Sequence, residues 1–265
     1  MTRSSWDRRR RRAQELLARR PSTSQLLAFY DHLLRLQQDM RRQLDWRSAS
    51  RSQGSASFFE QLDVEFAAAW VPRLLDIAQK HGPAKLAGET ARMNSAAVEN
   101  QPRMLAEFLR NRQEADDATS SFVARVLLQP CAELEASRRP LPPVYTKAVC
   151  PICASRPQLA VLRPEGDGGK RHLVCSFCFT EWEFRRVICP ICEETDKDKL
   201  PRYSAEDPIA VRVEACDTCK AYLKSFDMTV DGLMVPEVDE IASVALDLWA
   251  VEHGYYKFQL NLLGF

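Results

Sequence analysis

The sequence predicts an α+β protein with an N-terminal all-α helical domain, two tandem metal modules and a C-terminal helix. The first observation is the placement of cysteine, because residues 1–149 contain only Cys131 and residues 150–219 contain the other eight. The second is the spacing of apolar residues, which is helical before this boundary and typical of short strands after it. The third is a repeated cysteine pattern, whose two copies are offset by 39 and 41 residues.

We place the domain boundaries where the composition changes. The helical domain covers residues 1–143. The proline-rich segment RRPLPPVY, residues 138–145, spans its end, stops a helix and favours an extended linker. The first metal module covers residues 144–187 and the second covers residues 188–230. Residues 231–265 hold the C-terminal helix and tail.

Apolar stripes predict the helices of the N-terminal domain. A turn at 21–24 is expected to start one helix, whose stripe consists of Leu26, Leu27, Tyr30, Leu33 and Leu34. A second stripe runs from Phe58 to Ile77, where Pro72 is expected to kink or split the helix. Further helical runs cover residues 84–99, 104–112 and 121–134.

The C-terminal segment EVDEIASVALDLWAVEHG, residues 237–254, predicts one amphipathic helix. Its apolar face is expected to consist of Ile241, Val244, Ala245, Leu248 and Trp249. Gly254 stands at a plausible C-terminal cap. The apolar tail that follows is expected to pack back on the protein, because so many exposed apolar groups would be a liability.

The charge balance argues against nucleic acid or anionic lipid as a partner of the whole molecule. The chain has 37 basic and 36 acidic residues, a net charge of +1. An arginine run, Arg8 to Arg12, is not followed by the apolar segment of an export signal, and no apolar run is long enough to span a membrane. We expect a soluble cytoplasmic protein without stable membrane insertion, and a solvated helix face or frayed tail at the arginine run.

The eight clustered cysteines form four Cys-x-x-Cys pairs: Cys150 and Cys153, Cys175 and Cys178, Cys189 and Cys192, and Cys216 and Cys219. AVCPIC at 148–153 recurs as VICPIC at 187–192, and RHLVCSFC at 171–178 matches RVEACDTC at 212–219. Two copies of one unit predict that the first pair shares a metal with the second, and the third with the fourth. The ten residues after Cys178 are then the bridge between the copies, and their rigidity would set the distance between the ions.

Two Cys-x-x-Cys knuckles supply four thiolates, which close a tetrahedral shell. A closed shell favours a structural or electron-transfer metal over a hydrolytic one, which needs an open position for water. Zinc and a single rubredoxin-like iron both satisfy this geometry, so the modules are either rubredoxin-like or zinc-ribbon modules. In a reducing cytoplasm the competing hypothesis is a thioredoxin-like dithiol, which expects one such motif and not four.

The residues around the knuckles allow other interpretations. The aromatic residues could stack on bases, but residues 145–228 hold 13 basic and 13 acidic residues, so a packing role is favoured for Phe177, Phe179, Trp182 and Phe184. Arg171 and Arg212 occupy equivalent repeat positions and either offset thiolate charge or support the fold. His172 is expected to be solvated and Cys131 to be a buried thiol. No phosphate loop, nucleophile elbow or other catalytic constellation is found.

The cysteine segments, with "TEW" at 180–182 and ASVALDLWAVEHGY at 242–255, resemble the FdhE family of formate dehydrogenase accessory proteins. The resemblance is specific from about Cys150 to the C-terminus. It implies a helical domain followed by two rubredoxin-like modules, with iron bound by the eight cysteines Cys150, Cys153, Cys175, Cys178, Cys189, Cys192, Cys216 and Cys219. Ala154 and Glu193 depart from the family pattern, since glycine commonly follows the second cysteine of these knuckles.

The resemblance implies a cytoplasmic accessory protein, not an enzyme, that assists maturation of respiratory formate dehydrogenase. Its partner would be the catalytic subunit of that enzyme, which contains molybdenum and selenocysteine, before export. The implied cofactors are two iron ions, with zinc as the alternative. A zinc-ribbon nucleic-acid-binding protein and a thiol-disulfide oxidoreductase remain as other functions.

Overall fold

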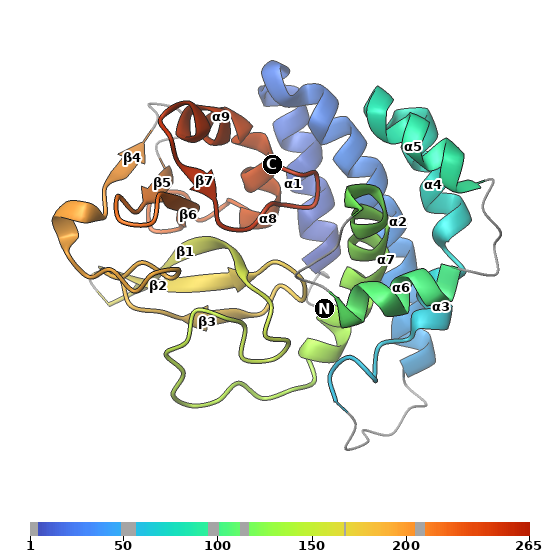
Figure 1. Ribbon diagram of the computed structural model, residues 1–265, viewed down its shortest axis with the longest axis horizontal. Helices are drawn as coiled ribbons and strands as arrows, with labels where there is room; N and C mark the ends of the chain where they lie inside the picture. Colours follow the sequence, from blue (N-terminus) through green and yellow to red (C-terminus); the bar gives the residue numbers. More distant parts are fainter. Residues whose placement is uncertain (1–4, 49–56, 95–100, 112–116, 167, 205–209) are drawn as a thin grey trace. The chain divides into compact units, whose positions relative to one another are not determined.

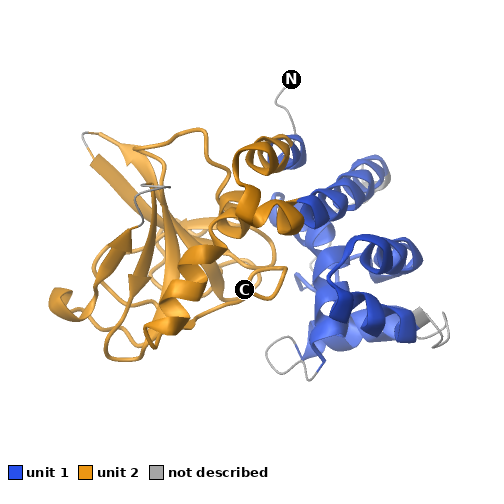
Figure 2. Ribbon diagram, turned by 90° about the horizontal axis from the view of Figure 1, so that it is seen from above, with its two compact units in different colours: residues 1–10, 28–138 blue, residues 11–27, 139–265 orange. Residues whose placement is uncertain are grey.

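The structure, a computed structural model, describes residues 5–48, 57–94, 101–111, 117–166, 168–204 and 210–265. The chain forms two compact units, which Figure 2 distinguishes by colour. The first unit comprises Met1–Arg10 and Ala28–Arg138, and the second comprises Arg11–Leu27 and Arg139–Phe265. A segment near the N-terminus therefore belongs to the same unit as all eight clustered cysteines.

The chain up to the linker is helical, as the sequence predicts (Figure 1). Its helices are α1 (Ser5–Arg19), α2 (Ser24–Ser48), α3 (Val64–Ala68), α4 (Val71–His81), α5 (Ala84–Asn94), α6 (Gln101–Arg110) and α7 (Ala118–Ala136), with a 3-10 turn η1 (Pro21–Thr23) before α2. Pro72 lies in the first turn of α4, where its missing N–H costs nothing, so it splits the second stripe. The expected ends of two further helices, at 95–99 and 112, lie outside the described residues.

The expectation of a solvated arginine run is wrong for two of its members. Arg8 and Arg11 are exposed, but Arg9 and Arg12 are buried. Arg9 pairs with Glu133 of α7 at 2.8 Å, and Arg12 makes a bidentate pair with Asp239. The reason is helical spacing, which places Arg9 and Arg12 on the same face of α1. Each of them pairs there with a carboxylate from a distant part of the sequence. Among the described helices, none is long and apolar enough to cross a membrane.

The two cysteine repeats share one sheet. The first copy supplies β1 (Pro157–Glu165), β2 (Gly168–Cys175) and β3 (Glu181–Glu183), and the second supplies β4 (Arg202–Ser204), β5 (Val211–Ala215) and β6 (Ala221–Asp227). Within each copy neighbouring strands are antiparallel, in the order β3-β2-β1-β6-β5-β4. Parallel pairing of β1 with β6, from Leu159 opposite Lys224 to Leu162 opposite Asp227, joins the copies.

The C-terminal helix is interrupted at Ser243, which the sequence did not predict. The structure has α8 (Pro236–Ala242) and α9 (Val244–Glu252). Lys224 Nζ donates to the carbonyl oxygens of Glu240 and Ser243, so carbonyl groups at the end of α8 bind a buried ammonium group.

The break changes which side of α9 is buried. The predicted apolar face is therefore wrong for Ala245 and Leu248, which are exposed, whereas Leu246 and Ala250 are buried in the core cluster with sheet residues. Gly254 follows α9 with φ +81°, consistent with the predicted cap. The tail packs back through β7 (Tyr256–Lys257), which pairs with β6.

A cluster of buried charges holds this tail. Lys224 of β6 and Lys257 of β7 contact Glu240 of α8 and Asp247 of α9, and all four side chains are at most 4% exposed. Lys224 Nζ lies 2.6 Å from Asp247, and Lys257 Nζ lies 2.8 Å from Asp247. Asn261 donates to Glu240 at 2.6 Å. Two ammonium groups thus neutralise two carboxylates, which is the condition under which buried charge is tolerated.

The pKa values of the cluster follow from burial and pairing. Burial lowers the pKa of Lys224. Burial also works to raise the pKa of Glu240, but the two lysines outweigh it and bring that pKa to about 2. Burial works to lower the pKa of Lys257, and its two carboxylate partners outweigh it, so that this pKa is raised. Glu240 is therefore ionised wherever the protein is folded near neutral pH.

Glu240→Gln is expected to lower the free energy of unfolding by about 3–5 kcal/mol, because one carboxylate would remain for two buried ammonium groups. A depressed pKa adds stability above the unfolded value of 4.5, and this stability is lost as the pH falls toward about 2. Urea unfolding of both proteins at several pH values should show the difference shrinking over that window. Exposed Glu252 supplies the control, since E252Q should change stability by less than about 0.5 kcal/mol. An E240Q protein as stable as the parent would contradict this assignment.

Candidate metal centres

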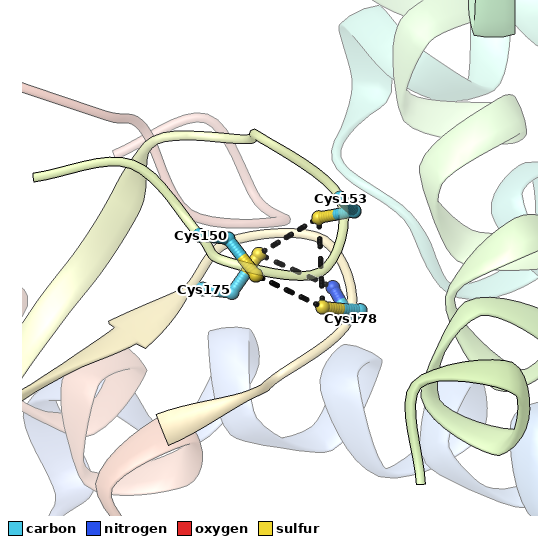
Figure 3. A group of neighbouring side chains, drawn as sticks. All are labelled: Cys150, Cys153, Cys175 and Cys178. Atoms are coloured by element: carbon cyan, nitrogen blue, oxygen red, sulfur yellow. Dashed lines mark hydrogen bonds between the residues drawn. The ribbon is translucent and has the colours of Figure 1, made fainter. Parts of the chain in front are cut away.

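Among the described residues, two groups of four cysteines are placed to hold a metal ion. The first consists of Cys150, Cys153, Cys175 and Cys178, whose sulfur atoms point toward one another (Figure 3). The second consists of Cys189, Cys192, Cys216 and Cys219. In each group one knuckle precedes the first strand of its copy, and the other stands at the end of the second strand, β2 in the first copy and β5 in the second. This is the sequential pairing that the repeat predicts.

The sulfur positions fit a tetrahedral metal site. In the first group Cys150 Sγ lies 3.6 Å from Cys178 Sγ, and Cys153 Sγ lies 3.4 Å from Cys175 Sγ. In the second group the corresponding distances are 3.7 Å for Cys189 to Cys219 and 3.6 Å for Cys192 to Cys216. A regular tetrahedron with metal–sulfur bonds of about 2.3 Å has edges of about 3.8 Å. The two groups are close to this size without rearrangement.

The pKa values of the cysteines in the two groups also favour a bound cation. Burial raises the pKa of Cys175 well above its ordinary value. Hydrogen bonding with Cys150 lowers the pKa of Cys153 far below its ordinary value and raises that of Cys178. In the second group burial raises the pKa of Cys189, and it raises that of Cys219 to about 11. A charge on one sulfur thus opposes ionisation of its neighbours, and a bound metal ion removes this opposition.

Each knuckle is a tight turn with the same backbone conformation. The residue after its second cysteine has positive φ: Ala154 at 56°, Phe179 at 56°, Glu193 at 61° and Lys220 at 60°. The turns close through backbone bonds such as Ala154 N to Cys150 O at 2.9 Å and Glu193 N to Cys189 O at 3.1 Å. Backbone N–H groups of Ile152 and Ile191 also donate to sulfur, each at 3.4 Å. Ala154 and Glu193 therefore adopt the left-handed conformation that favours glycine.

The two arginines at equivalent repeat positions support the fold. Arg171 is buried, and its guanidinium group lies 2.7 Å from Glu214, which joins β2 of one copy to β5 of the other. Arg212 pairs with Asp227 at 3.2 Å. His172 is partly buried, with Nδ1 3.7 Å from Glu181, so the solvated position expected for it is wrong. Carboxylates, and not thiolates, are thus the partners of both arginines.

Three of the four aromatic residues near the first group are buried, as a packing role predicts. Phe177, Trp182 and Phe184 are 3%, 4% and 7% exposed, and Phe179 is partly buried. Trp182 Nε1 donates to the carbonyl oxygen of Lys147 at 3.1 Å. Cys131 is buried in α7, also as predicted. The aromatic faces needed for stacking on bases are therefore largely covered by protein.

Sequence reasoning missed two hydroxyl groups that contact sulfur. Thr180 Oγ1 lies 3.0 Å from Cys178 Sγ, and Ser155 hydrogen-bonds to Cys153. Each stands two residues after the second cysteine of its knuckle, where a short hydroxyl side chain returns to the sulfur. A hydroxyl residue two positions after the second cysteine of a knuckle is the pattern in the sequence that could have identified these contacts.

A helical N-terminal region and a shared sheet with two four-cysteine sites define a class of protein with paired metal modules. Residues 149–186 match the family model "FdhE, central domain", and residues 187–263 match "FdhE, C-terminal domain". Over these matched residues the chain is similar to the FdhE family. Both repeats and the C-terminal helices lie within the matched residues.

Individual proteins of this family are also similar to the chain. A "Protein FdhE homolog" of Aquifex aeolicus is 28% identical over 257 residues, covering 92% of this chain and 90% of that protein. "Protein FdhE" of Escherichia coli is 34% identical over 113 residues, which cover 42% of this chain and 36% of that protein. The crystal structure of the FdhE protein from Pseudomonas aeruginosa superposes with a TM-score of 0.73, covering 99% of this chain and 97% of that one at 23% identity. That likeness shows the shared fold.

Glycine at the strained knuckle positions is expected to stabilise the protein. Ala154→Gly and Glu193→Gly should each raise the free energy of unfolding by about 1 kcal/mol, because glycine adopts positive φ without a Cβ clash. Thermal unfolding should then shift upward by about 2–4 °C per substitution. Both side chains are exposed. The control is Glu252→Gly at the end of α9, which should lower stability, and a loss of stability in E193G would contradict the argument.

Proposed function

We propose that this protein is an accessory factor in the assembly of respiratory formate dehydrogenase and is not itself an enzyme. In this proposal it binds the catalytic subunit of that enzyme in the cytoplasm before export. Each four-cysteine group holds one metal ion, with iron as the ion that the family resemblance implies and zinc as the alternative. Similarity to the FdhE family supports the partner, and the two sulfur tetrahedra support the metal sites.

The observation that carries the proposal is the closed geometry of both sulfur groups. Four thiolates fill a tetrahedral shell, so no position is left on the metal for water or substrate. Such a site can hold a fold together, and with iron it can also accept and donate an electron. This chemistry suits a factor that recognises or reduces a client better than it suits a hydrolase.

The alternatives from the sequence have less support. A nucleic-acid-binding ribbon needs exposed aromatic residues and a basic surface, but the aromatic residues are mostly buried and the module has balanced charges, to which eight thiolates add negative charge. A thiol-disulfide oxidoreductase needs a reactive dithiol, whereas the pairs here converge in fours. Metal binding accounts for all eight cysteines at once.

The purified protein is expected to contain two metal ions per chain by elemental analysis. Iron would give a red protein with sulfur-to-iron charge-transfer absorption, and zinc a colourless one. Cys150→Ser and Cys189→Ser should each lose one ion, because each removes one ligand from a different group. Cys131→Ala lies outside both groups and should retain two. A metal-free native protein, or eight thiols that react at once without chelator, would contradict metal binding.

The catalytic subunit of formate dehydrogenase is expected to co-purify with the native protein and with C131A. Capture should fall when both metal sites are disrupted, since the modules would lose the cross-links that fix their surfaces. Circular dichroism would establish that the helical domain of the variant remains folded. Failure of the folded, metal-loaded protein to retain the subunit would contradict the partner assignment. Retention on DNA or RNA that weakens with salt would favour the nucleic-acid alternative.

A further inference from the structure

The two cysteine groups have different exposure although their sequences repeat. All four members of the first group are buried, at 2% exposure or less. In the second group Cys189 and Cys216 are buried, but Cys192 is exposed and Cys219 is partly exposed. An external ligand can therefore reach the second group from solvent at Cys192, and it meets protein on approaching the first.

The side-chain hydrogen bonds to sulfur also differ between the two groups, and they protect the first group more than the second. Thr180 and Ser155 place hydroxyl groups on Cys178 and Cys153 of the first group. The equivalent positions of the second repeat hold Ala221 and Glu194. The alanine side chain has no polar group, and an ionised carboxylate only accepts hydrogen bonds, so neither side chain can donate to a thiolate. The contact of Ala221 with Cys219 is made by its backbone N–H alone.

The carboxylate of Glu194 also accepts hydrogen bonds from other groups of the second repeat. Its carboxylate accepts the Thr218 hydroxyl at 2.6 Å and the backbone N–H groups of Thr195 and Asp196, each at 3.0 Å. These bonds shape the knuckle of Cys192 and leave the sulfur without the hydroxyl contact that Ser155 provides in the first repeat. Hydroxyl donors stabilise thiolate charge and hold ligands in place, so their loss favours ligand dissociation.

We propose that the second site is an exchange site, where an external thiolate ligand enters at Cys192, while the first site is structural and holds its metal permanently. In the exchange step a metal–sulfur bond to the incoming thiolate forms and the bond to Cys192 breaks. The released Cys192 thiolate takes a proton from water, and no electron moves. This inference rests on the metal-binding part of the proposed function. It gives the protein a site that can pass a metal to a partner or join one through a shared ligand.

The test is metal release from the protein loaded with two zinc ions, with a coloured chelator in excess. Release should be biphasic, one ion per phase, with rates that differ by about 10-fold or more, the size of effect seen when the surroundings of metal ligands change. Cys192→Ser should abolish the fast phase and leave the slow one. Alkylation by iodoacetamide, mapped by mass spectrometry, should modify Cys192 first. Two ions that leave at one rate, or a fast phase that persists in C192S, would overturn the inference.

Substitution of the threonine hydroxyl groups distinguishes the effect of a hydroxyl bond to sulfur from a general effect on folding. Thr180→Val should accelerate the slow phase, because it removes the donor to Cys178 at nearly constant volume. Thr218→Val is the matched control, since its hydroxyl bonds to Glu194 and not to sulfur, and it should leave the slow phase unchanged. Equal effects of T180V and T218V on the slow phase would overturn the role of the hydroxyl. A protein that binds no zinc would contradict the proposed function as well, whereas one that binds two ions of equal lability would contradict this inference alone.

Discussion

Four sulfur atoms within 4.8 Å of one another are the constraint on which the second unit depends. Each repeat is about the size below which a chain needs a staple to fold, and its strands are too few to bury a core alone. A metal ion at the centre of each group would remove the mutual repulsion of the thiolates and tie two knuckles together. The left-handed residues that close the knuckles, Ala154 and Glu193 among them, are strained, and metal binding would offset that strain.

The metal sites define each repeat, and the sheet joins the repeats. Parallel pairing of β1 with β6 places the strands of both copies side by side, and the buried Arg171–Glu214 pair adds a second link between them. The residues between Cys178 and Cys189 do more than bridge the copies, since β3 lies within them and pairs with β2. The separation of the two sites is therefore set by sheet pairing as well as by that bridge. The lysine and carboxylate cluster then fixes α8, α9 and the tail to β6.

The sequence was sufficient for those features that depend on local spacing. Cys-x-x-Cys knuckles, the proline that splits α3 from α4, and the turn that starts α2 involve neighbours in the chain, so periodicity and turn chemistry predict them. Features that depend on distant partners were not predictable in this way. Arg12 is buried because it pairs with Asp239, which lies 227 residues further along the chain. The C-terminal helix breaks because Lys224 of β6 donates to its carbonyl groups. The unequal exposure of the two cysteine groups also arises from packing, since the repeats themselves match.

X-ray absorption at the edge of the bound metal tests the central claim most directly. The account predicts a first coordination shell of four sulfur atoms at about 2.3 Å for every metal ion in the protein, with no lighter scatterer. Because both sites are closed by cysteine, this result should hold for iron and for zinc. A shell that contains oxygen or nitrogen would contradict the account, since it would show that at least one site has an open or non-cysteine position.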